Sequence, residues 1–363
     1  MSEIPSDMFD EHDFQQAEFE KVTALVAGEF QIQEALLVEG IPTYYLTWPQ
    51  ETKQAFLRLL TRLEEMNLIA LLRKVEGRIV LRVVSKPPVN PSNPRTNLLL
   101  LLATIATTFF TGYIGFPGTG IDPIVSGVIF SAAILTVLGI HEMGHKLTAN
   151  KKKIDATAPY FIPGLPPLGT MGAVIMQKSL PRNRDALFDV GANGPIAGFI
   201  VALICSAVGL MLLIPAPKPP DVGTLNLMPV SWILLGQALS GLHLVPQIVP
   251  PNEVLLLHPL TWAGWAGMVV TMLNLLPAAM LDGGHVARSS ISSDKKRLIL
   301  TFGSVAILLL TGTEFIFMAF LIVFMSMFKH PGPLDDVSSL STNRKLLTVV
   351  LVAVFILAFP IRV

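Results

Sequence analysis

The sequence predicts an α-helical polytopic membrane protein of about six to seven transmembrane helices, with a short membrane-associated β-hairpin and a small soluble α+β domain at the N-terminus. Of its 363 residues, 52% are hydrophobic and only 14% are charged, which is too apolar for an ordinary soluble domain. After residue 96 the apolar residues gather in runs of about 20, the length that crosses a bilayer. The first 90 residues instead carry 14 acidic and 9 basic side chains and are typical of a soluble domain.

Composition also excludes several classes of protein. The formal net charge is zero, which argues against nucleic acid as a partner. The single cysteine, Cys205, stands in an apolar run; it rules out an internal disulfide and is expected to be a packing residue. The acidic N-terminus has neither a basic stretch nor an apolar core, so we expect no cleaved signal peptide.

Residues 1–90 form the predicted soluble domain, which we expect in the cytoplasm. Apolar spacing and Glu-Gly turn sequences predict two helices and two hairpins, the helices at 14–26 and 50–66 and the hairpins at 35–48 and 68–84. No catalytic constellation stands out here. A regulatory or docking role and a purely stabilising role both remain open.

Residues 91–96 close a proline-rich stretch and form the predicted linker, because prolines fix φ and remove backbone donors. The membrane domain then covers 97–363, with a catalytic core at about 97–290. The predicted spans are 97–116, 124–146, 185–214, 254–276 and 345–360, with two short apolar runs in 297–328 that form either tilted partners or a shallow hairpin. Prolines and glycines in 158–177 forbid a helix and predict a β-hairpin, whereas 215–253 is a loop with a surface helix at 231–242.

A His-Glu-x-x-His sequence, His141 to His145, lies at the end of the second predicted span. On a helix the two histidines are four residues apart, so they share one face and can bind one Zn²⁺ per chain. Glu142 projects beside them, where it can take a proton from water. The alternative is an interfacial helix end with two solvated histidines.

A hydrolytic zinc centre needs a third protein ligand. Asp282 is the best candidate, because a carboxylate in an apolar stretch is costly unless it is paired or ligating. Its alternative role is to cap a helix at 283–290. His243 and His258 are expected to be interfacial or core residues.

Basic residues give the orientation. With seven spans, Lys and Arg fall almost entirely on the side that also holds the N-terminal domain and the ends bearing His141, His145 and Asp282, while the opposite side receives only Lys218 and Arg362. By the positive-inside rule the basic side is cytoplasmic. We therefore expect a multi-pass protein of the cell membrane with its N-terminus and active site towards the cytoplasm.

Three motifs together resemble the site-2 protease family of intramembrane zinc metalloproteases. They are His141-Glu142-x-x-His145, Asn193-Gly-Pro-Ile-Ala-Gly198 and Asn274-x-x-Pro277-x-x-x-Leu281-Asp282-Gly283. The resemblance covers about residues 95–290. Within the family, this sequence is similar to archaeal and cyanobacterial or chloroplast members, and no PDZ or CBS domain is expected in it. It implies that His141, His145 and Asp282 bind zinc, that Glu142 is the general base, and that Asn274 contacts the scissile carbonyl.

The resemblance also implies a substrate: a membrane protein cut within or near a transmembrane segment in the lipid bilayer. A transmembrane helix must unwind before it is cut, and its freed backbone groups then need new partners. We expect these from an edge strand to which the substrate adds, formed by Met171, Gly172, Ala173, Val174 and Ile175. The alternative is a hairpin that only packs.

Other functions compete with this interpretation. A different zinc peptidase would use a distal glutamate, but Glu253 and Glu314 are predicted on the opposite side of the membrane. A metal transporter would need further polar groups along its path, and the spans are nearly bare of them. An inactive binding homologue is disfavoured because Glu142 is intact.

Overall fold

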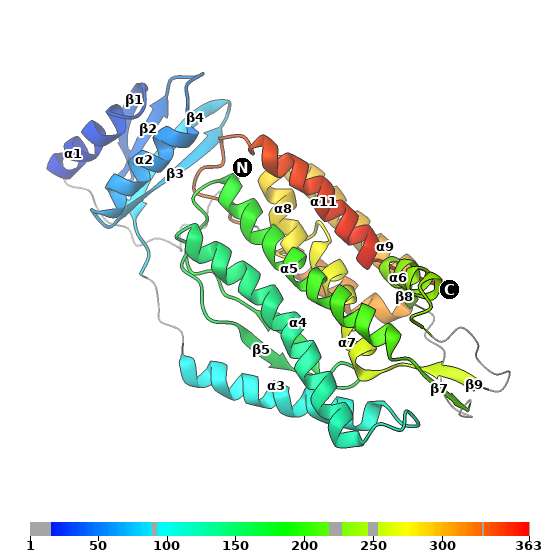
Figure 1. Cartoon of the computed structure of the whole chain (residues 1–363). Helices are drawn as coiled ribbons and strands as arrows, with labels where there is room; N and C mark the ends of the chain where they lie inside the picture. Colours follow the sequence, from blue (N-terminus) through cyan, green and yellow to red (C-terminus); the bar gives the residue numbers. More distant parts are fainter. Residues whose placement is uncertain (1–15, 89–92, 218–226, 246–252, 329, 363) are drawn as a thin grey trace.

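A small β-sheet unit and a bundle of helices make up the chain (Figure 1). The computed structural model describes residues 16–88, 93–217, 227–245, 253–328 and 330–362. In the sheet unit the four antiparallel strands have the order β1-β2-β4-β3. Its elements are α1 (Gln16–Ala27), β1 (Ile32–Val38), β2 (Ile41–Leu46), α2 (Lys53–Glu64), β3 (Leu68–Val75) and β4 (Arg78–Ser85).

Both predicted hairpins of this unit are confirmed, and each turns on a Glu-Gly pair. Glu39 and Gly40 have φ values of 52° and 76°, and Glu76 and Gly77 have 51° and 86°. Two successive positive φ values are typical of the type I′ turn, which matches the twist of the flanking strands. Both predicted helices are present, although Phe14, which begins the first prediction, lies outside the described residues.

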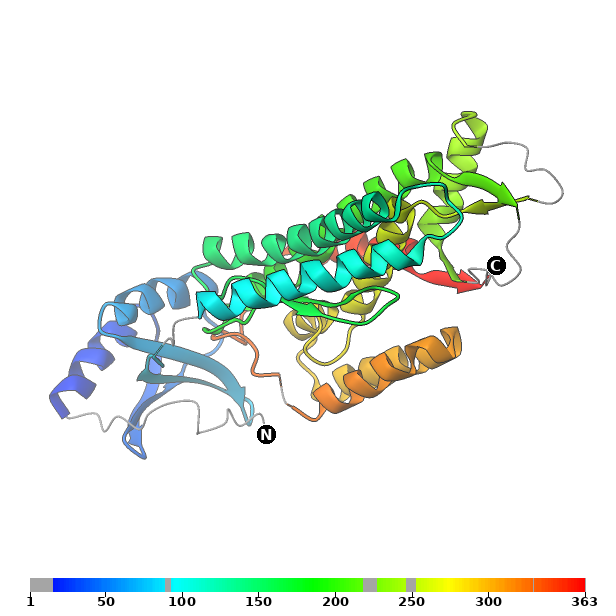
Figure 2. The same cartoon turned by 90° about the horizontal axis from the view of Figure 1, so that it is seen from below.

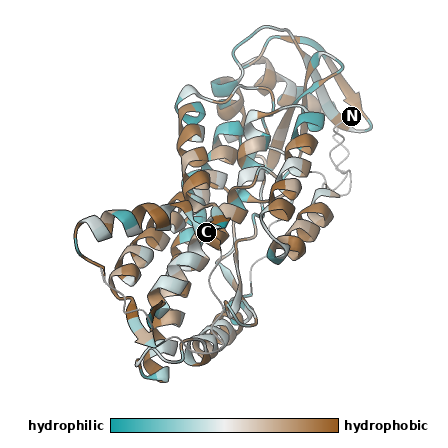
Figure 3. Cartoon of the chain, turned by 90° about the vertical axis from the view of Figure 1, so that its right-hand side faces the viewer, coloured by the Kyte–Doolittle hydropathy of each residue, from teal (hydrophilic) through white to brown (hydrophobic). Residues whose placement is uncertain are grey.

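The helical part begins at α3 and contains most of the apolar residues, which Figure 3 shows concentrated along the helices. Its helices are α3 (Pro94–Gly115), α4 (Pro123–Lys151), α5 (Arg184–Met211), α6 (Val230–Gly241), α7 (Pro259–Leu275), α8 (Asp282–Ser290), α9 (Asp294–Thr311), α10 (Ile316–Ser326) and α11 (Thr342–Ala358). Within the described ranges, α3, α4 and α5 are the three helices long and apolar enough to cross a membrane. At 17 residues each, α7 and α11 are shorter.

Two sequence predictions are wrong at their boundaries. The predicted linker 91–96 extends too far, because α3 starts at Pro94 with Asn93 as its cap; residues 91 and 92 lie outside the described part. The predicted span 254–276 starts too early, because β9 (Glu253–Leu256) pairs there with β7 (Ile214–Pro217). Apolar strands and apolar helix starts look alike in sequence, and Pro259 then sets the first turn of α7.

The predicted hairpin between the second and third spans is confirmed. β5 (Tyr160–Pro163) pairs antiparallel with β6 (Thr170–Val174), with Phe161 opposite Ala173. The hairpin lies beside α3, and Figure 2 shows it next to that helix. These two strands form a sheet of their own, so β6 has an open edge on the side away from β5.

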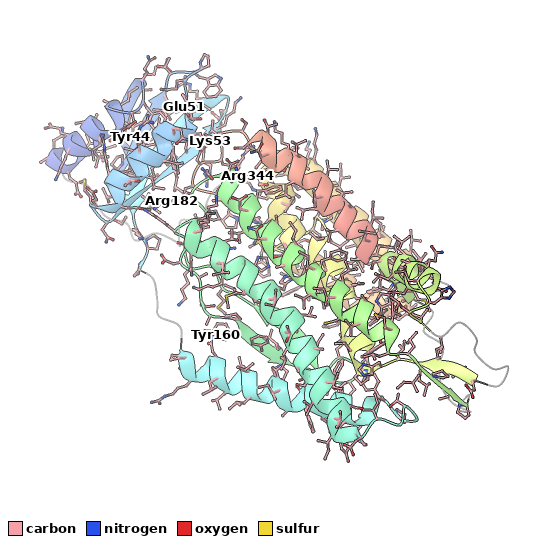
Figure 4. The ribbon with its side chains drawn as sticks, viewed as in Figure 1. Tyr44, Glu51, Lys53, Tyr160, Arg182 and Arg344 are labelled. Atoms are coloured by element: carbon pink, nitrogen blue, oxygen red, sulfur yellow. The ribbon has the colours of Figure 1, made fainter. Side chains whose placement is uncertain are left out.

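A short extended segment, 334–336, joins the sheet unit to the helices. The Leu72 amide in β3 donates to the Leu334 carbonyl at 2.9 Å, and the Asp335 amide donates to the Arg182 carbonyl at 3.0 Å. Segment 334–336 therefore lies between β3 and the chain entering α5. Arg182 also forms a two-pronged ion pair with Glu64 of α2, at 2.6 and 2.8 Å; Figure 4 shows Arg182 at this junction.

Candidate metal centre

Helix α4 carries the His-Glu-x-x-His sequence on its buried face. Asp122 caps the helix by accepting from the amides of Ile124 and Val125. Some 20 residues further, His141, Glu142 and His145 are 3%, 6% and 9% exposed. The interfacial alternative, two solvated histidines at a helix end, is therefore wrong.

Helix α8 brings Asp282 to the same point. Leu281 occupies the cap position of this helix, so Asp282 is its first helical residue and not the cap that the alternative proposed. A Cβ at Gly283 would lie 2.2 Å from the Leu275 carbonyl oxygen. Glycine is required there, because the start of α8 presses directly onto the end of α7, and this contact sets the position of the carboxylate.

The three predicted ligands converge in space. Asp282 Oδ2 lies 3.2 Å from His141 Nε2 and 3.3 Å from His145 Nε2, and the two Nε2 atoms are 3.1 Å apart. Among the described residues, these three form the one group of three or more His, Cys, Asp or Glu side chains able to hold a metal ion. Asp282 is 137 positions from His145 and 141 positions from His141 in the sequence, and the fold brings the three side chains together.

The chemistry of this donor set fits a zinc ion. The Nδ1 atom of His145 lies 2.7 Å from the Val190 carbonyl oxygen, which can only accept, so Nδ1 carries the proton and Nε2 is a bare acceptor. That acceptor faces a carboxylate, and a cation between them removes the repulsion. Two ligands of a tetrahedral zinc with bonds of about 2.0–2.1 Å lie about 3.3 Å apart, which matches the three edges of this triangle.

Helix α5 packs onto the histidines through its glycines. A Cβ at Gly194 would lie 2.0 Å from His145 Nε2, and one at Gly198 would lie 2.8 Å from His141 Nδ1. The glycines of the Asn193–Gly198 motif therefore pack directly against the imidazole rings of the two predicted ligands. A small-residue sequence alone gave no signal for that.

Glu142 and Asn274 lie next to the triangle without joining it. Glu142 Oε1 is 4.0 Å from His141 Nε2, and the Ile175 amide donates a hydrogen bond to the Glu142 carboxylate. Asn274, near the end of α7, places Nδ2 3.3 Å from His141 Nε2. All of these residues line a cavity of about 220 Å³ that Ala173 and Val174 of β6 also border.

The hydrogen bonds of the edge strand indicate which of its backbone groups face this cavity. The Met176 carbonyl accepts from the Thr157 amide, so the backbone groups of Met176 face the β5 side. β6 ends at Val174, so Ile175, the last residue of the predicted edge strand, lies just beyond it. Because backbone groups alternate along a strand, those of Ala173, and of Ile175 beyond the end of β6, face the open edge. The bond from Ile175 to Glu142 agrees with this alternation.

His243 and His258, and the two distal glutamates, do not belong to the metal-binding group. His258 caps α7 by accepting from the Leu260 amide, and His243 follows the end of α6. Neither Glu253, in β9, nor Glu314, before α10, belongs to the metal-binding group.

Sequence reasoning missed a second pair of imidazoles close by. His285 Nδ1 lies 2.7 Å from His330 Nε2, and His285 follows Asp282 by one turn of α8. Burial, followed by His285 and the arginines of this region, lowers the pKa of His330 to about 2. The neutral imidazole of His330 is thus the favoured form, and it forms a hydrogen bond with His285. The His285 spacing was visible in the sequence, but His330 comes from a distant segment with no recognisable motif.

Comparisons with known proteins agree with this geometry. A family described as "Peptidase family M50" matches residues 129–311. The probable zinc metalloprotease EGY1, chloroplastic, of Arabidopsis thaliana is 35% identical over 179 residues, covering 47% of this chain and 30% of that protein. The probable zinc metalloprotease EGY2, chloroplastic, of the same plant is 34% identical over 200 residues, covering 54% and 34%. The matches thus span about a third of these relatives. No solved structure matches the chain.

Proposed function

This chain belongs to peptidase family M50, and from that premise we propose that it is an intramembrane zinc metalloprotease, which hydrolyses peptide bonds within or near transmembrane segments of other membrane proteins. The observation that carries the proposal is the buried triangle of His141, His145 and Asp282, with Glu142 beside it and an open strand edge across the cavity.

His141, His145 and Asp282 would hold the zinc. When bound, zinc would polarise a carbonyl and lower the pKa of water, so that the water can lose a proton near neutral pH and attack that carbonyl. Glu142 lies outside the ligand triangle, so its carboxylate is available to take the proton of the attacking water and pass it to the leaving amine. The bond from the Ile175 amide holds that carboxylate at the cavity.

The substrate backbone would be held by β6. An unwound transmembrane helix has free amides and carbonyls that need partners in the bilayer. The open edge of β6 offers the amide and carbonyl of Ala173, and the carbonyl of Ile175 lies just beyond the end of β6. A strand added there passes Glu142. Asn274 would then donate to the oxygen of the carbonyl under attack.

The proposal also includes the number of membrane spans and the side of the membrane on which the sheet unit lies. We propose six to seven spans, formed by α3, α4 and α5 together with the shorter α7, the α9–α10 pair and α11. The basic ends of these helices lie on the side of the sheet unit, which we place in the cytoplasm. The comparisons do not favour metal transport, the alternative function.

The test is cleavage of a single-span substrate by the purified chain and by its Glu142→Gln variant. We expect both proteins to hold one zinc per chain and only the parent to cleave, because the glutamate moves protons and does not ligate. Equal cleavage by the two proteins, or loss of zinc from the variant, would contradict the assigned role.

A further inference from the structure

A second, larger cavity of about 490 Å³ adjoins the cavity over the metal ligands. Pockets of about 300–1,000 Å³ are the size that encloses small ligands or a few side chains. The two cavities share part of their walls, so they are neighbours separated only by a few side chains. The shared residues are Val174, Ile175, Gln177, Met280, His285 and Met325.

The larger cavity lies where the sheet unit meets the helices. Glu64, Ile69 and Lys86 of the sheet unit line one side, and the chain from Gln177 to Arg182, which continues from β6 towards α5, lines another. This places the cavity at the polar end of the bundle, where the backbone leaves the apolar spans. The proposed protease mechanism gives no role to the sheet unit, and the cavity is the point at which that unit comes nearest to the site.

Most of the charged side chains that line the larger cavity are cationic. Lys86, Lys153, Lys178 and Arg182 line the cavity against only two carboxylates, Glu64 and Asp155. The fork between Arg182 and Glu64 removes one charge of each sign. Within the described residues Lys86 and Lys153 form no ion pair, whereas the neighbouring Lys152 is paired with Asp189 at 2.6 Å.

The course of β6 connects this charge to the site. A substrate strand added to the open edge of β6 passes Ala173 and Ile175, and its continuation runs alongside Gln177 into the larger cavity. Extended chain advances about 3.3 Å per residue. The residues of the substrate that enter the cavity therefore lie within a few positions of the cut bond.

We propose that this cavity binds an acidic extramembrane segment of the substrate, adjacent to the cleaved bond, through Lys86 and Lys153. The inference rests on the proposed protease function and adds to it the class of substrate: a membrane protein whose transmembrane segment ends in Asp or Glu residues on the side of the sheet unit. The sheet unit then contributes directly to substrate selection.

The experiment compares matched single-span substrates that share one transmembrane segment and differ only in the flanking segment, which carries either Asp and Glu or the isosteric Asn and Gln. The full zinc-loaded chain in a neutral detergent should cleave the acidic substrate with a kcat/KM about three to ten times higher, the effect of two partly exposed ion pairs. The neutral detergent excludes anionic lipid headgroups as the source of the effect. In 1 M salt the preference should vanish, because the screening length falls to about 3 Å.

Charge-reversal variants test whether Lys86 and Lys153 are the residues that bind the acidic flank. The double variant Lys86→Glu/Lys153→Glu should lose the preference for the acidic flank and prefer a Lys-rich flank, and the milder Lys86→Gln/Lys153→Gln variant should lose the preference without reversing it. Lys151→Glu is the matched control, because Lys151 is exposed two residues from Lys153 and does not line the cavity. It should behave as the parent does.

Failure of this inference differs from failure of the proposed function. Cleavage that depends on Glu142 yet is equal for acidic and amide flanks, or a preference that survives both double variants, overturns the basic site alone. Absence of any cleavage dependent on Glu142 overturns the protease assignment. Substrate affinity measured on the Glu142→Gln protein tests the basic site in that case as well: equal dissociation constants for the two flanks count against it, and tighter binding of the acidic flank supports it.

Discussion

Replacing Gly194 by alanine should release zinc from the centre. The added Cβ would lie 2.0 Å from His145 Nε2, and also 2.4 and 2.5 Å from the adjoining ring carbons. Ordinary contact between such atoms is about 3.5 Å, so the imidazole must retreat by about 1.5 Å. That movement breaks its 2.7 Å bond to the Val190 carbonyl and its 3.3 Å approach to Asp282.

The size of the effect follows from this displacement. Disturbing the groups that orient a metal ligand typically lowers metal affinity about 10–100-fold, and a shift of about 1 Å in a catalytic group costs about 100-fold in rate. We therefore expect at least about 100-fold lower kcat/KM and substoichiometric zinc after dialysis. Alanine in place of glycine otherwise stabilises a helix by about 1 kcal/mol, so without the collision the variant would be more stable than the parent.

Zinc content by elemental analysis and cleavage of a single-span substrate measure both effects. Gly209→Ala is the control for crowding in α5 away from the metal, because its Cβ would lie 2.5 Å from the Thr261 amide nitrogen; it should lose stability and keep zinc. Gly303→Ala, where the Cβ meets open space, should change neither. A Gly194→Ala protein with one zinc per chain and the parent's rate would refute the reasoning.

Three further predictions concern the ligands and the strand. Asp282→Ala should lose zinc on dialysis, since two histidines leave the ion under-coordinated; a full equivalent of retained zinc would place the third ligand elsewhere. Asn274→Ala should keep zinc and slow cleavage by about 10²–10³, the usual effect of removing one donor to a developing oxyanion, and an unchanged rate would return it to a packing role. Ala173→Pro should keep zinc and lose cleavage because its amide faces the open edge, and Ile175→Pro should keep zinc and lose cleavage because it removes the amide that bonds Glu142. Val174→Pro should instead weaken the hairpin itself and lower the melting temperature. Parent rates in the first two proline variants would exclude the edge strand as a substrate clamp.

The parts of the site that sequence analysis located are those determined by local rules. Helical spacing alone puts His141 and His145 on one face, and the cost of a charge in an apolar stretch singled out Asp282. The contacts that orient these groups could not be found in this way. The Val190 carbonyl behind His145 is a backbone group in another helix, and every residue type offers one.

The same distinction between local and long-range contacts applies to the fold. The two Glu-Gly hairpins were predicted because a positive φ requirement marks their turns in the sequence. The pairing of β7 with β9 and that of Leu72 with Asp335 join segments distant in the chain, and neither has a pattern of its own. The number of spans stays a prediction, because α7 and α11 are too short to be recognised by length alone.

Segment 334–336, which lies between β3 and the chain entering α5, imposes an order on assembly during synthesis. About 250 residues separate Ser85, the end of the sheet unit, from Asp335. At about 5–20 residues per second, roughly 12 to 50 seconds pass before that segment leaves the ribosome. Throughout this time β3 is an uncovered edge able to pair with other chains. The newly made sheet unit thus depends on a rapid supply of the downstream helices, and a pause in translation before residue 334 would lengthen its exposure to aggregation.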